Sequence, residues 1–114
     1  MTPQRRQAWL WLAQRASAAV LVLCVVVHLV TMVVAVRSGL GAAEILGRTR
    51  GSVVWAVFYG VFVVAVAIHA PIGVRTLLAE ASGGYRRGVD VASVAFALLL
   101  LASGMRAVYA VTVA

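Results

Sequence analysis

Two histidines lie inside long apolar stretches of this 114-residue sequence, where a polar side chain is energetically costly and needs a partner. On a helical wheel, His69 shares one face with Phe58, Phe62 and Gly73. A histidine with aromatic neighbours, and with a glycine that leaves space one turn away, would suit a flat ring such as haem. Alternatively, each imidazole could hydrogen-bond a backbone carbonyl across a helix interface. The residues alone leave both interpretations open for His28 and His69.

Other small and polar residues fall on the same helical faces as the two histidines. Within about 40° of the line through His28 lie Ser17, Cys24, Thr31 and Ala35. Thr76 and Glu80 extend the face of His69. The third apolar stretch repeats the pattern with Ser93, Ala97 and Gly104. Such stripes are where membrane helices approach one another closely or meet a cofactor.

The composition restricts the kind of protein that can carry these residues. Hydrophobic residues make up 64% of the chain and charged residues only 11%, against roughly 25% in soluble domains. This excludes a soluble globular domain and an intrinsically disordered chain. All ten basic residues are arginines, and they lie between apolar stretches instead of forming a stripe. They therefore indicate membrane flanks and contact with lipid, and no nucleic-acid partner is expected.

Three uncharged stretches, 16–36, 51–74 and 91–105, predict an all-α integral membrane protein. We expect transmembrane helices over about 15–37, 52–79 and 90–112, arranged up-down-up. Pro71 lies inside the second helix, so the carbonyl of Ala67 needs another partner or the helix kinks there. The connections are short and rich in glycine, so residues 1–114 should form one domain within a larger heteromeric helix bundle. A cleaved signal peptide is an alternative for the first stretch, which is too long for one.

The distribution of arginines favours one orientation in the membrane. The N-terminus and the second connection share one side, which carries Arg5, Arg6, Arg15, Arg75, Arg86 and Arg87. The other side carries Arg37, Arg48 and Arg50, with Arg106 if that side chain extends to the far interface. The positive-inside rule therefore predicts a cytoplasmic N-terminus for a multi-pass protein of the inner (cytoplasmic) membrane.

The motif around His69 resembles a known family. The second helix reads His69-Ala-Pro-Ile-Gly73-Val-Arg75, and Glu80 follows eleven positions after the histidine. This pattern resembles the cytochrome b membrane-anchor subunits of succinate dehydrogenase and fumarate reductase. The segment Gln14-Arg15-Ala16-Ser17-Ala18 is similar to the R-x-S-G or R-x-T-A start of the first helix in that family. Two positions depart from the pattern, because Gln14 replaces a histidine and Ala81 replaces a tyrosine.

The resemblance implies a membrane anchor for a flavoprotein subunit and an iron–sulfur subunit, usually paired with a second membrane-anchor subunit. Electrons from succinate would pass through the iron–sulfur clusters to quinone, with a haem b between the anchor helices. His69 would be an axial haem ligand and Arg75 would neutralise a haem propionate. The quinone end would involve Arg15, Ser17 and Glu80.

His28 is a second candidate for an axial ligand. At 1.5 Å per residue, His28 lies about 20 Å from Arg15, and His69 lies about 16 Å from Glu80. If Arg15 and Glu80 mark the same membrane face, both histidines could reach similar depths and ligate one haem. Alternatively, His28 would serve a second haem.

The chain has no nucleotide-binding loop, flavin fingerprint or cysteine cluster, so we expect no catalysis by the chain alone. Dehydrogenase chemistry would then belong to its soluble partners. The alternatives are a cytochrome b subunit of another respiratory complex, an anchor of fumarate reductase, and a small structural or regulatory membrane protein without a cofactor.

Overall fold

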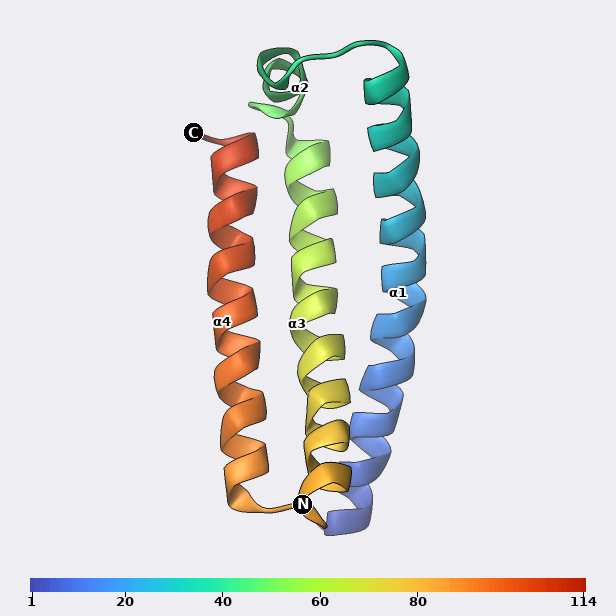
Figure 1. The fold of residues 1–114 in the computed structure, drawn as a ribbon, viewed down its shortest axis with the longest axis vertical. Helices are drawn as coiled ribbons and strands as arrows, with labels where there is room; N and C mark the ends of the chain where they lie inside the picture. Colours follow the sequence, from blue (N-terminus) through green and yellow to red (C-terminus); the bar gives the residue numbers. More distant parts are fainter.

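A computed structural model describes all residues, 1–114, as four helices without strands. The helices are α1 (Pro3–Arg37), α2 (Ala42–Thr49), α3 (Val53–Ser82) and α4 (Arg87–Thr112). The three long helices run alternately up, down and up (Figure 1), and each is long and apolar enough to cross a membrane. The predicted all-α membrane bundle is therefore confirmed. The N-terminus and the α3–α4 turn share one end, and α2 and the C-terminus share the other.

The long helices extend past the predicted boundaries. The first helix starts at Pro3 instead of residue 15, and the Thr2 side chain caps it by accepting a hydrogen bond from the Arg5 amide at 3.2 Å. Arginine favours helix formation, so the charges at Arg5 and Arg6 mark a limit of the hydrocarbon and not of the helix. The second long helix continues to Ser82, where Gly83 ends it with a φ of 84°.

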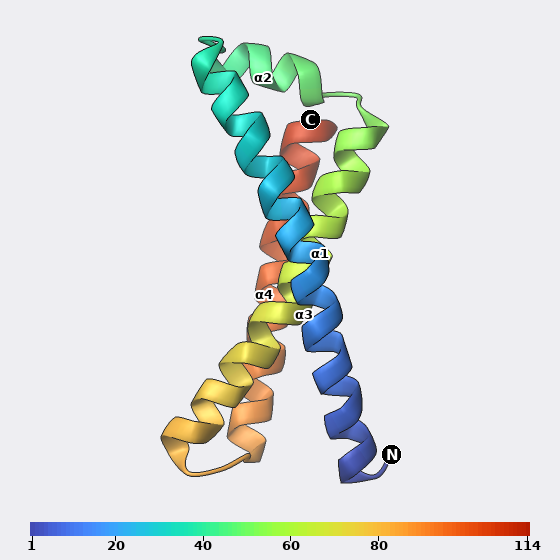
Figure 2. The same ribbon diagram turned by 90° about the vertical axis from the view of Figure 1, so that its right-hand side faces the viewer.

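The predicted connection over 38–51 contains a short helix, α2, that sequence analysis missed. Figure 2 shows α2 lying across the end of the bundle. The Thr49 hydroxyl donates a 2.6 Å hydrogen bond to the carbonyl of Val111, and the Gly51 amide donates one of 2.8 Å to the carbonyl of Thr112. These bonds hold α2 against the C-terminal end of α4.

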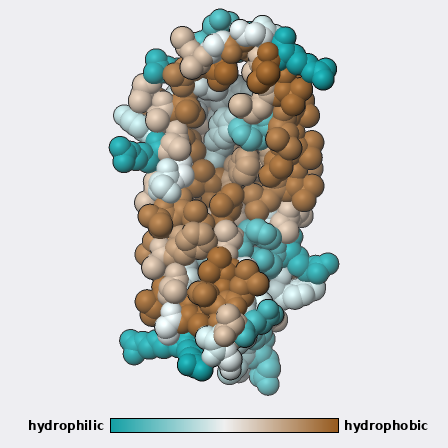
Figure 3. Space-filling view, viewed as in Figure 1, coloured by the Kyte–Doolittle hydropathy of each residue, from teal (hydrophilic) through white to brown (hydrophobic).

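Helix α3 lies between α1 and α4 and packs against both. Its contact with α4 is close at Gly104, where an added Cβ would lie 2.5 Å from a methyl carbon of Val63. On α1 the predicted stripe faces inward, since Ser17, Cys24 and Ala35 are all buried. The predicted contact face of α1 is therefore confirmed. Most other apolar side chains are exposed, and Figure 3 shows them as a brown belt between teal ends, as expected for a surface that meets lipid.

Figure 2 shows α3 crossing α1 at an angle. Pro71 is buried in the second half of α3. Proline lacks the backbone N–H that would bond to the carbonyl of Ala67, so the helix continues past Pro71 without that hydrogen bond.

Candidate functional site

His69 lies where α1 and α3 meet. It is one turn from Ala65, which lines a groove together with Ser17, and one turn from Gly73, which faces Gln14. The His69 Nδ1 atom is buried and has no hydrogen-bond partner in the chain. Buried polar atoms are almost always paired, so an atom without a partner points to a group supplied from outside.

Gln14 contributes a second unpaired polar atom to the same contact. Its Oε1 is buried without a partner, and its Nε2 lies 3.6 Å from the place that a Cβ on Gly73 would take. Gln14 occupies the position where the resembling family carries a histidine. The sequence motif and the α1–α3 packing therefore bring the unpaired atoms of Gln14 and His69 to one interface.

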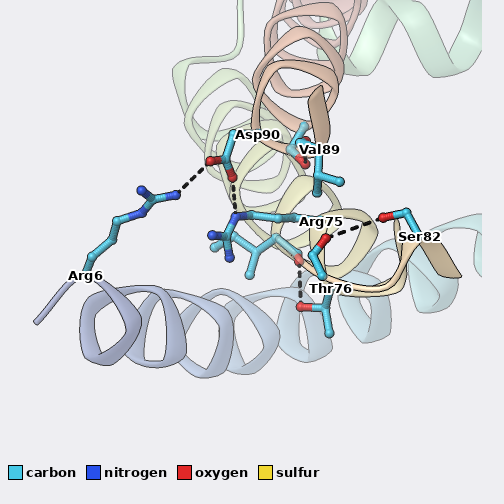
Figure 4. A network of polar contacts seen from close by, with 9 residues as sticks. Arg6, Arg75, Thr76, Ser82, Val89 and Asp90 are labelled. Atoms are coloured by element: carbon cyan, nitrogen blue, oxygen red, sulfur yellow. Dashed lines mark hydrogen bonds and ion pairs between the residues drawn. The ribbon is translucent and has the colours of Figure 1, made fainter. Parts of the chain in front are cut away.

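Arg75 is 8% exposed and does not stand free within the chain. Its Nε donates a 2.8 Å hydrogen bond to Oδ1 of Asp90, and its guanidinium carbon lies 4.2 Å from the centre of the Tyr85 ring. Arg6 reaches the same carboxylate from α1, with its Nη2 at 3.1 Å from Oδ2 (Figure 4). Sequence analysis missed Asp90, although it is the only acidic residue in the first turn of α4.

The three predicted quinone residues do not meet within this chain. Ser17 is buried, and its hydroxyl donates to the Gln14 carbonyl at 3.1 Å. Arg15 is exposed, with its guanidinium carbon 5.1 Å from the Trp11 ring centre. Glu80 is exposed and lies seven residues beyond Gly73, so Arg15 and Glu80 are about 12 Å apart along the bundle.

His28 lies at a different level from His69. Its Nδ1 is 3.4 Å from the Tyr59 hydroxyl, and its ring meets those of Tyr59 and Phe62 edge to face. These two aromatic residues precede His69 by seven to ten positions, which is roughly 10–15 Å along α3. The structure therefore does not bring the two imidazoles together around one ring. The depths differ from those expected because Arg15 is not level with Glu80.

A cavity of about 470 Å³ lies beside His28, and all four helices line it. Figure 3 shows this end of the molecule hollowed, with paler atoms inside a brown rim. The hydroxyl of Thr49 in its wall is already bonded to Val111, and that of Ser103 bonds to the Leu99 carbonyl at 2.7 Å. His28 and Tyr59 are therefore its main polar groups.

Comparison with known sequences agrees with the motif. A model of the family described as succinate dehydrogenase/fumarate reductase transmembrane subunit matches residues 2–103. Neither the search of curated proteins nor that of solved structures found a match. The match spans α1, α2, α3 and most of α4, including His69 and Arg75. The chain therefore belongs to the family of succinate dehydrogenase/fumarate reductase transmembrane subunits, which form a complex with the other subunits of the enzyme.

Proposed function

We propose that this chain is the haem b-binding membrane anchor of a succinate dehydrogenase. It would hold the flavoprotein and iron–sulfur subunits at the cytoplasmic side of the inner membrane and support electron transfer to quinone. The observation that carries the proposal is His69, whose buried Nδ1 lacks a partner within the family motif. The arginine-rich end, with the N-terminus and the α3–α4 turn, would face the cytoplasm.

The residues around His69 fit a haem. The buried Nδ1 of His69 has no hydrogen-bond partner in the chain, so no group of the chain competes with iron for it. A neutral imidazole is a common iron ligand, and the α1–α3 contact would hold its ring in orientation. The second axial ligand would come from a second anchor subunit, because His28 lies at another level. When bound, haem b supplies a one-electron carrier.

Arg75 would neutralise a propionate of that haem. It follows His69 by six residues, which is about 9 Å along α3. Its Nε is bonded to Asp90, and its two terminal nitrogens form no hydrogen bond in the chain. A buried guanidinium with free N–H groups is well suited to a carboxylate, which it can bind with two parallel hydrogen bonds.

Among the residues predicted for the quinone end, Arg15 carries the positive charge. Its exposed guanidinium could donate to a quinone carbonyl and stabilise the negative charge that arises on reduction. Ser17 would first have to release the Gln14 carbonyl. Glu80 lies at the rim of the same end, so the partner subunits would have to close the distance between Glu80 and Arg15.

A haem spectrum of the assembled complex tests the proposal. In His69→Ala, the reduced b-type absorption per flavin should be lost, because the iron loses an axial ligand. His28→Ala is the matched control, because it removes a histidine side chain at a different depth in the bundle. An unchanged haem signal in His69→Ala would refute the assignment, and loss of the whole signal in His28→Ala alone would reverse it.

A further inference from the structure

We propose that Asp90 and Tyr85 are positioning residues that hold the Arg75 guanidinium ready for a carboxylate. The inference rests on the proposed haem site, because a propionate of the haem would be that carboxylate. Neither residue belongs to the short motif from His69 to Arg75. Tyr85 lies in the α3–α4 turn and Asp90 in the first turn of α4, and the fold returns both to Arg75.

The geometry of the ion pair leaves the binding edge of Arg75 free. Asp90 bonds to Nε at 2.8 Å, which is the side of the guanidinium away from the end that binds a carboxylate through two terminal nitrogens. The ring of Tyr85 lies 4.2 Å from the guanidinium carbon and restricts rotation out of plane. One side chain therefore fixes the direction of the guanidinium and the other fixes its plane.

The surrounding groove gives the guanidinium access to a ligand. A groove of about 340 Å³ runs between α1, α3 and α4, and its wall includes Arg6, Pro71, Arg75, Asp90 and Ser93. Arg75 is thus buried against protein on one side and adjoins this groove on the other.

The charges of the cluster also favour an anion. Asp90 is shared between Arg75 and Arg6, so two positive charges face one negative charge. Asp90 therefore orients Arg75 without cancelling the positive charge of the cluster. The negative charge of a propionate would neutralise the remaining positive charge. Asp90 is itself stabilised at this position, because it occupies the first turn of α4, where a helix favours negative charge.

The experiment measures the rate of haem loss from the assembled complex, with haem counted per flavin. Asp90→Asn should accelerate the loss about tenfold, which is the effect expected when one charge-assisted hydrogen bond no longer holds its arginine. Asp90→Glu should recover most of the retention. In an Arg75→Gln background, Asp90→Asn should have no further effect, because Asp90 acts through Arg75. Glu44→Gln, an equivalent change at the opposite end, is the matched control.

Tyr85→Leu keeps the test decisive if Asp90→Asn does not assemble. Tyr85 is 51% exposed, so its replacement does not remove a core residue. Loss of the cation–π contact should accelerate haem loss about threefold, again only while Arg75 is present. Equal acceleration with and without Arg75, or none at all, would overturn the inference alone. A wild-type complex without b-type haem would overturn the proposed function and this inference with it.

Discussion

The contact between Gly104 and Val63 gives a sharp prediction about the packing that positions α4. An alanine Cβ at residue 104 would lie 2.5 Å from one methyl carbon of Val63, 3.0 Å from the other and 3.3 Å from its Cβ. Carbon atoms normally pack at about 3.5–4.0 Å, so Gly104→Ala requires a shift of about 1 Å. Overpacking of this kind costs about 1–3 kcal/mol.

A double-mutant cycle separates this clash from other effects of Gly104→Ala. Alanine stabilises a helix interior by about 0.5–1 kcal/mol relative to glycine, so the expected net loss is about 1–2 kcal/mol. Val63→Ala removes both methyl groups that would collide, and in that background Gly104→Ala should become neutral or stabilising. The expected coupling between the two positions is therefore about 2 kcal/mol.

Thermal unfolding of the purified complex in detergent, followed through its helical signal, measures the four stabilities of the cycle. Gly60→Ala is the matched control, because an added Cβ at that helical glycine meets no heavy atom within 4 Å. Additive effects of Gly104→Ala and Val63→Ala would show that α3 and α4 are not in contact here. In that case the position of Asp90 beside Arg75 would also lose its support.

Two further predictions address the ends of the bundle. Thr49→Val should make amide exchange in α2 about fivefold faster, because it removes a hydrogen bond to Val111 that is worth about 1 kcal/mol. Ser103→Ala is the control, because it removes a hydrogen bond within α4 and should leave exchange in α2 unchanged. Unchanged exchange in Thr49→Val would mean that α2 is held by its apolar side chains. Arg15→Gln should raise the KM for quinone about tenfold in succinate-dependent quinone reduction while the haem spectrum is kept, and an unchanged KM would exclude Arg15 from quinone binding.

The number and type of the long helices could be predicted because lipid imposes a simple requirement on sequence. A span needs about 20 apolar residues, and three stretches meet that length. The ends of the helices could not be predicted from charge, because the helix continues through Arg5 and Arg6 once Thr2 caps it. Helix α2 is only eight residues long and lies between glycines, so its pattern is too short to separate it from a loop.

The candidate site was predictable only where one helix carries it. His69, Gly73 and Arg75 lie on α3 at a spacing that sequence alone reveals. Asp90 escaped notice because its pairing with Arg75 depends on how the α3–α4 turn folds back. The relative depths of His28 and His69 depend on the sliding of α1 against α3, which helical periodicity does not encode. Contacts such as that of Gln14 with Gly73 set that register.

The ion pair between Arg6 and Asp90 and the buried face of α1 require the same rotation of this helix about its axis. This helix carries apolar side chains around most of its circumference, so contact with lipid does not favour one rotation about the helix axis over another. Because α1 is unbroken from Pro3 to Arg37, the azimuth of Arg6 sets the azimuth of Ser17, Cys24 and His28. One residue inserted between Arg6 and Gln14 would turn these side chains by about 100° relative to Arg6. The helix could then form the ion pair with Asp90 or bury its contact face against α3, but not both.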